Sequence, residues 1–121
     1  MGRNWEELRV WQDAHAFVLA LHPFIKSLPA DERYALADQI RRAAYSVPAN
    51  IVEGHAKGSL KDFNKFLYIS RGSLEEVRYF LRLAKDLEYL GVETYEDMMK
   101  TTTKISKMIN RLIITNREKS V

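Results

Sequence analysis

The segment Gln39-Ile40-Arg41-Arg42-Ala43-Ala44-Tyr45-Ser46-Val47-Pro48-Ala49-Asn50-Ile51-Val52-Glu53-Gly54 decides the fold, because it places a proline inside an apolar pattern of helical spacing. A proline within a helix removes one backbone donor and clashes with the carbonyl four residues earlier, here that of Ala44. The Ser46 hydroxyl or the Arg41 guanidinium can bond a freed carbonyl, and small residues leave room for a neighbouring helix: Ala43, Ala44, Ser46 and Ala49. We expect one helix kinked at Pro48. The alternative is a helix that ends near Ser46 and a second that starts at Pro48, because a residue that precedes proline disfavours helical angles.

Proline and glycine divide the whole chain into four amphipathic segments. Their apolar residues recur at spacings of three and four, which predicts helices over residues 5–28, 31–57, 59–90 and 94–116. Pro29 and Gly91 end the first and third helices, while Asp31, Ser59 and Thr94 are the expected N-caps. Because the connections are short, consecutive helices should run antiparallel. The 121 residues therefore predict one all-α domain, an up-down-up-down four-helix bundle.

The third segment carries more apolar surface than one core requires. The residues that widen its apolar face are Phe66, Ile69, Phe80, Leu83, Leu87 and Leu90. Two interpretations fit this excess: a helix packed between two neighbours, or a second contact surface for self-association. Ser70, Gly72 and Ser73 interrupt the same helix, and an interior glycine costs about 1 kcal/mol relative to alanine. We therefore expect close helix packing at these three residues.

Positive charge is concentrated near the C-terminus although the net charge is only +3. Four cations recur at spacings of four, three and four residues with no acidic residue between them, and we call them the basic stripe: Lys100, Lys104, Lys107 and Arg111. Such a stripe attracts polyanions with a salt-sensitive affinity that is independent of base sequence. The alternative interpretation is an ordinary solvated helix face.

The third segment supplies a second basic row, which consists of Arg71, Arg78, Arg82 and Lys85. Arg78, Arg82 and Lys85 of this row are candidate nucleic-acid ligands. Acidic neighbours at Glu75 and Glu76 can pair with the arginines, so the alternatives are a structural row or one that binds the acidic segment 86–97 of another subunit. If the stripe and the row lie on one side, or are repeated around a ring, the local field exceeds what the net charge suggests.

The proline segment holds further polar candidates. Arg42 is a candidate phosphate ligand, whereas Arg41 is expected to bond Glu53 or a carbonyl freed by Pro48, and Asn50 belongs to the same motif. The two tryptophans, Trp5 and Trp11, are expected to pack as core and staple residues because large aromatics at helical spacing usually do so.

Three motifs together carry a family resemblance. They are Leu8-Arg9-Val10-Trp11-Gln12, the proline segment 39–54, and Phe66-Leu67-Tyr68-Ile69-Ser70-Arg71-Gly72-Ser73-Leu74-Glu75-Glu76. From about Trp5 to Leu112 the chain resembles the four-helix-bundle proteins encoded in intervening sequences of bacterial 23S (large-subunit) ribosomal RNA genes. The accessory variability proteins of diversity-generating retroelements share that architecture. The resemblance implies a non-enzymatic bundle, often a fivefold ring, with a nucleic-acid or ribonucleoprotein role.

Several function classes lack their signatures in this sequence. There is no cysteine, the segment 1–7 is too charged for a signal peptide, and no apolar run reaches the roughly 20 residues of a membrane span. His15, His22 and His55 lack the spacing of metal-binding helix pairs, and no phosphate loop follows Gly54. We expect a cytoplasmic protein without metal, cofactor or membrane partner, and not an enzyme.

The sequence thus predicts a homo-oligomeric helical scaffold, pentameric by family precedent, that binds RNA or DNA or a ribonucleoprotein through basic surfaces. Two alternatives remain open. One is an accessory protein that serves a retroelement reverse transcriptase, and the other is a purely structural oligomer with no nucleic-acid partner.

Overall fold

Four long helices account for most of the chain. The computed structural model describes residues 4–120, so residues 1–3 and 121 of the predicted domain lie outside the described part. The helices are α1 (Arg9–Ser27), α2 (Leu36–Ala56), α3 (Leu60–Asp86) and α4 (Val92–Lys119), and two short 3-10 helices are η1 (Trp5–Glu7) and η2 (Ala30–Glu32). No strand occurs between residues 4 and 120. The prediction of an all-α four-helix bundle is confirmed.

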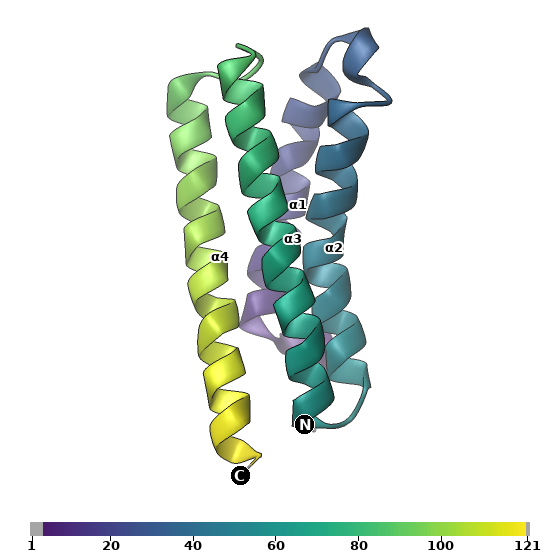
Figure 1. Ribbon diagram of the computed structural model, residues 1–121, viewed down its shortest axis with the longest axis vertical. Helices are drawn as coiled ribbons and strands as arrows, with labels where there is room; N and C mark the ends of the chain where they lie inside the picture. The colour runs from purple at the N-terminus through teal and green to yellow at the C-terminus, as the bar shows by residue number, and fades with distance from the viewer. Residues whose placement is uncertain (1–3, 121) are drawn as a thin grey trace.

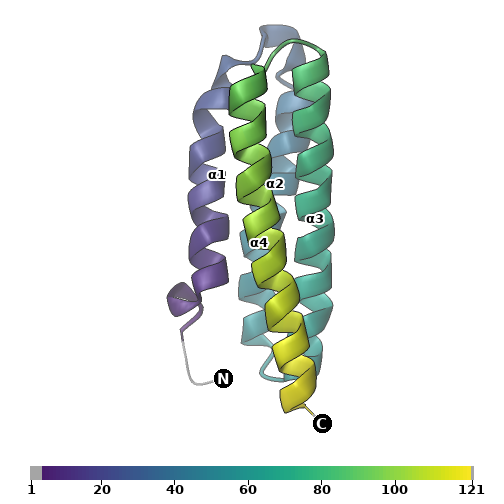
Figure 2. The same ribbon diagram turned by 90° about the vertical axis from the view of Figure 1, so that its left-hand side faces the viewer.

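The four helices stand side by side around one core. Each helix contacts its two neighbours around the bundle, in the pairs α1–α2, α2–α3, α3–α4 and α1–α4. Figure 1 shows α3 between α2 and α4, and both views show successive helices running in alternating directions (Figures 1 and 2). This arrangement leaves α2 and α4 at opposite corners of the bundle.

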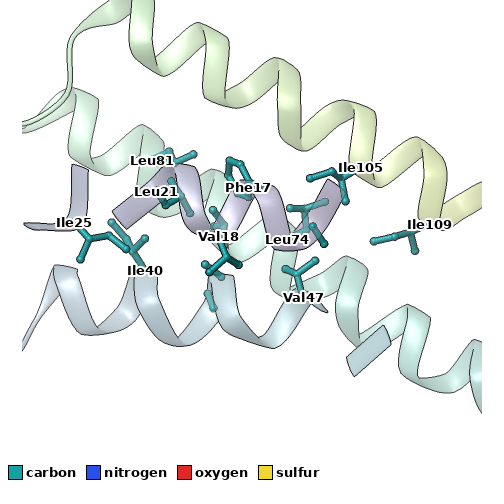
Figure 3. Packing of buried hydrophobic residues seen from close by; sticks show 14 of the residues in the cluster. Phe17, Val18, Leu21, Ile25, Ile40, Val47, Leu74, Leu81, Ile105 and Ile109 are labelled. Atoms are coloured by element: carbon teal, nitrogen blue, oxygen red, sulfur yellow. The ribbon is translucent and has the colours of Figure 1, made fainter. Parts of the chain in front are cut away.

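The core is built from the apolar stripes that helical periodicity selects. Every long helix contributes side chains with almost no exposure, among them Leu21, Ile40, Leu74 and Ile105 (Figure 3). Residues three and four positions apart share one helix face, which explains why these stripes meet along the bundle axis. Among residues 4–120, five polar residues are buried with them: Asn64, Ser70, Ser73, Thr102 and Asn116.

The first two helices begin later than predicted. The segment 5–28 divides at Leu8 into η1 and α1, and α1 contains Pro23, a second internal proline that the sequence analysis did not consider. The segment that follows Pro29 forms η2, so α2 starts at Leu36 and Asp31 does not cap it. The N-cap of α2 is Ala35, which offers no side-chain acceptor.

Of the two caps predicted for the starts of α3 and α4, the one at Ser59 is confirmed and the one at Thr94 is wrong. The Ser59 Oγ accepts a 3.1 Å hydrogen bond from the Asp62 amide, as predicted. A hydrogen bond between the Ser59 side chain and the Asp62 carboxylate also holds the pKa of that carboxyl below its usual value. However, α3 ends at Asp86 rather than Leu90, and the chain turns through Glu88 at a φ of 65°. Gly91 is the N-cap of α4, so Thr94 lies within the helix and caps nothing.

The helix α2 continues through Pro48 from Leu36 to Ala56. The prediction of one helix is therefore confirmed over the alternative of two, while the kink angle stays a prediction. The expected partners were wrong: Arg41 bonds Asp38 at 2.8 Å, one turn earlier on α2. The Val47 carbonyl, which is not the Ala44 carbonyl that the proline frees, accepts a 2.8 Å hydrogen bond from the Ser70 hydroxyl on α3.

A small polar cluster joins α2 to α3 beside the proline. The Asn50 amide donates to the Ser46 carbonyl and to the Ser46 Oγ, each at 2.8 Å. The Ser46 Oγ in turn lies 2.8 Å from the Ser73 Oγ. Asn50 thus links Ser46 to this cluster, while Glu53 is exposed and takes no part in it.

The helices α2 and α3 approach each other closely at Gly54. A Cβ placed there would lie 2.7 Å from the Phe66 Cβ and 3.1 Å from the Phe63 carbonyl oxygen, so only glycine fits. The expected close packing is confirmed for Ser70 and Ser73, which are buried, but is wrong for Gly72. A Cβ on Gly72 would meet no atom within 4 Å.

Candidate nucleic-acid interface

The basic stripe lies on the side of α4 that faces away from the core. Thr102, Ile105 and Ile109 are fully buried, and the residues halfway around the helix from them are the stripe. All four stripe side chains are exposed: Lys100, Lys104, Lys107 and Arg111. Within residues 4–120, Lys100, Lys107 and Arg111 form no ion pair within 4.0 Å.

Lys104 differs from the other stripe residues because it faces a carboxylate on α1. Its Nζ lies 3.7 Å from the Asp13 Oδ2, which is too long for a hydrogen bond, and that oxygen is buried with no hydrogen-bond partner. Both residues line an open cavity of about 440 Å³ between α1 and α4. The positive charge of Lys104 is therefore partly balanced inside the protein, whereas its three companions keep their charge for solvent or a ligand.

The second basic row lies along the seam between α3 and α4. Arg71 donates a 2.8 Å hydrogen bond to the Asn110 Oδ1, and Arg78 donates to the Thr102 and Thr103 hydroxyls at 3.1 and 2.9 Å. These acceptors are neutral groups on α4. The seam thus fixes the two arginines in place without cancelling their charge, and it brings the row next to the basic stripe.

Carboxylates on α3 reduce the charge of the rest of the row. Arg78 also contacts Glu75 at 3.5 Å, as the sequence analysis allowed. Arg82 contacts Asp86 at 3.1 Å, and this carboxylate raises the pKa of the Arg82 guanidinium above its usual value. Lys85 lies 4.0 Å from Asp86 and 5.0 Å from the centre of the Tyr95 ring. Arg82 and Lys85 are therefore largely structural. Arg71 is the least neutralised member of the row.

Tyr68 lies at the lower end of the seam, the end nearer the C-terminus of α4, and the sequence did not predict that it meets two arginines there. The Tyr68 ring centre lies 4.9 Å from the Arg71 guanidinium carbon and 5.7 Å from that of Arg117. Arg117 also bonds the Tyr68 hydroxyl. Because 49 residues separate Tyr68 from Arg117, no local sequence spacing could have brought them together.

Two candidate groups lie elsewhere in the bundle. Arg42 is exposed on α2, where it bonds Gln39 of the same helix, and α3 separates it from α4 (Figure 1). Trp5 and Trp11 meet edge to face with ring centres 4.8 Å apart, and both are half-buried. That packing agrees with the predicted staple role of the tryptophans.

The described residues offer few features of other site types. Within residues 4–120, no three His, Asp or Glu side chains gather as metal ligands would, and no helix is both long enough and apolar enough to cross a membrane.

Comparison with known proteins places the chain in a family. The family model described as "23S rRNA-intervening sequence protein" matches residues 6–111. The chain belongs to the 23S rRNA-intervening sequence protein family. The family resemblance carried by the three sequence motifs is thereby confirmed, while the link to retroelement accessory proteins stays a prediction.

A solved structure agrees with this assignment. It is a protein of unknown function from the S23 ribosomal protein family of Bacteroides thetaiotaomicron, with a TM-score of 0.78 and 29% sequence identity. The match covers 86% of this chain and 97% of that one. No curated protein matches the chain. The stripe lies within the residues matched by the 23S rRNA-intervening sequence family, whereas Arg117 lies beyond them.

Proposed function

We propose that this protein is a non-enzymatic, self-associating helical scaffold that binds nucleic acid through the face formed by α3 and α4. The observation that carries the proposal is the set of exposed cations without ion pairs on α4: Lys100, Lys107 and Arg111. Arg71 adjoins them, held by a neutral amide.

The physical argument is that charge kept free of carboxylates is available to phosphate. A surface lysine with an acidic neighbour gains little from a further anion, whereas an unpaired row releases counterions when phosphate binds. The rigid α4 holds its three cations along one line, so a phosphate backbone can follow them. Such contacts position a nucleic acid without reading its bases.

The test is a charge-matched pair of triple variants. The stripe variant carries Lys100→Gln, Lys107→Gln and Arg111→Gln, and the control carries Lys26→Gln, Arg33→Gln and Lys57→Gln, which also removes three positive charges. At low salt, retention of RNA by the stripe variant should fall at least about tenfold, since each lost phosphate contact weakens binding to all sequences. The control should bind like the wild type. Equal losses in both variants would contradict the proposal.

Self-association would repeat the cationic face around an assembly. Support comes from exposed apolar side chains along α3 and at its C-cap, where Ile69 is 50% and Leu87 is 48% exposed. The half-buried Phe80 and Leu83 lie between them in the sequence, and exposed apolar surface of this kind marks a contact surface. The expected light-scattering mass is a multiple of 14.1 kDa, fivefold by family precedent, and Ile69→Glu with Leu87→Glu should give the monomer. A monomeric wild type would contradict self-association.

The same face would serve a complex of reverse transcriptase and RNA, the partner that the retroelement resemblance implies. A purely structural oligomer is the remaining alternative. It would be supported if the purified oligomer showed no affinity for RNA or DNA at low salt.

A further inference from the structure

The lower end of the α3–α4 seam combines an aromatic ring with two cations. Tyr68 is half-buried, and the guanidinium carbons of Arg71 and Arg117 lie 4.9 and 5.7 Å from its ring centre. We call these three residues the tyrosine clamp. It rests on two helices, so its geometry is set by the bundle and not by a loop.

The tyrosine clamp has no internal counter-charge. Arg71 bonds the neutral Asn110 amide, and Arg117 bonds the Tyr68 hydroxyl. Neither guanidinium forms an ion pair with a carboxylate within 4.0 Å among residues 4–120. Two like charges beside one ring repel each other, so an anion between them lowers the electrostatic energy.

The tyrosine clamp also continues the basic stripe. Asn110, which holds Arg71, is adjacent in sequence to Arg111 and lies one turn from Lys107. Ile114, three residues before Arg117, is 51% exposed and adds apolar surface on the same side of α4. A strand whose phosphates follow the stripe therefore arrives at an aromatic and apolar surface.

We propose that the tyrosine clamp binds one unpaired nucleotide, with the base stacked on Tyr68 and the phosphate held by Arg71 and Arg117. The bound polymer is then single-stranded nucleic acid, because a base inside a duplex has no free face to offer the ring. Stacking on an aromatic side chain tolerates any base, since every base has a π-face. This inference rests on the proposed function and specifies the form of nucleic acid that the face accepts.

The experiment compares two strands of equal length: oligo(dT), and an abasic strand that keeps the phosphates and lacks the bases. Tyr68→Leu removes the planar ring but keeps an apolar side chain against the core, and helical circular dichroism checks that it folds. The matched control is Tyr34→Leu. Tyr34 is an exposed tyrosine with the Arg33 guanidinium carbon 5.3 Å from its ring centre, and it follows η2 at the opposite end of the bundle from the C-terminus (Figure 1).

The expected results differ between the strands. Tyr68→Leu should weaken oligo(dT) binding at least about fivefold, the effect of losing one stacked base, and should leave the abasic strand unaffected. Tyr68→Phe should bind oligo(dT) more tightly than Tyr68→Leu because the ring remains, and Tyr34→Leu should change neither affinity.

Two outcomes separate the two proposals. If the wild type binds both strands equally and Tyr68→Leu has no effect, the tyrosine clamp is overturned while binding through the stripe stands. If the wild type binds neither strand, nor a duplex of the same length, both proposals fall.

Discussion

The two sides of α3 are joined to their neighbours by opposite means. On the α2 side the contacts are short and uncharged: Gly54 allows Phe66 to approach, and Ser46 meets Ser73 at 2.8 Å. On the α4 side the surface contacts are made by long cationic side chains, with Arg71 bonding Asn110 and Arg78 bonding two threonines. The first side excludes other molecules, whereas the second leaves charge at the surface.

This difference separates stability from binding within one helix. Close packing gains dispersion and burial only when backbones approach, so the α2 side needs glycine and serine. An arginine that is fixed only by a neutral acceptor keeps its full charge, so at Arg71 the α4 side holds a cation in place without neutralising it. Substitutions on the α2 side should therefore change unfolding, and those on the α4 side should change binding.

The largest effect on stability is expected for Gly54→Ala. The added methyl group would lie 2.7 Å from the Phe66 Cβ, which forces α2 and α3 apart. Overpacking of this kind costs about 1 to 3 kcal/mol, measured as the free energy of unfolding in urea. Variant protein that remains folded should bind RNA like the wild type. A neutral or stabilising effect would show that the two helices are not in close contact there.

The second effect concerns Asn50→Asp, which keeps the side-chain shape but removes both donated bonds to Ser46. Because the Ser46 carbonyl and the Ser46 Oγ then lose the hydrogen bonds that the Asn50 amide donates, the free energy of unfolding should fall by about 1 kcal/mol. Affinity for RNA should not change beyond the small effect of one distant charge. A loss of binding equal to that of a stripe variant would contradict the separation of the two sides.

A third, smaller effect has the opposite sign. Gly72→Ala adds a methyl group that meets no atom within 4 Å, so it should raise the free energy of unfolding by about 0.5 to 1 kcal/mol through helix propensity alone. The pair Gly54 and Gly72 thus serves as an internal control, with identical substitutions and opposite outcomes. Destabilisation by Gly72→Ala would contradict the account, because it would mean that a neighbouring atom lies close to Gly72.

The smallest effect on stability is expected for Asn110→Asp, the counterpart of Asn50→Asp on the α4 side. It places a carboxylate opposite Arg71, and such a half-exposed pair changes the free energy of unfolding by less than about 1 kcal/mol. Affinity for RNA should nevertheless fall several-fold, because Arg71 would then be neutralised. Unchanged affinity would mean that Arg71 does not contact the ligand.

Sequence periodicity was enough to find the four helices and most of the core, because burial repeats with the helical turn. It also found the Ser59 cap, whose acceptor and donor lie three residues apart. It wrongly placed a close helix contact at Gly72 and gave no sign of the one at Gly54, since only the position of Phe66 distinguishes the two glycines.

The candidate site shows the same limit. The stripe could be predicted because its residues share one helix face, but its uneven charge could not: Asp13, which balances Lys104, lies on α1, far away in sequence. Arg71, Asn110, Tyr68 and Arg117 meet only because α3 and α4 run side by side.

The most direct test of the cationic face is the slope of log affinity against log salt concentration for RNA binding by the full chain. Each phosphate contact contributes a slope of roughly −0.7 to −0.9, so Lys100→Gln, Lys107→Gln and Arg111→Gln together should reduce the magnitude of the slope by about 2 to 3. The triple control at Lys26, Arg33 and Lys57 should leave the slope unchanged. The same slope in wild type, stripe variant and control would contradict the account.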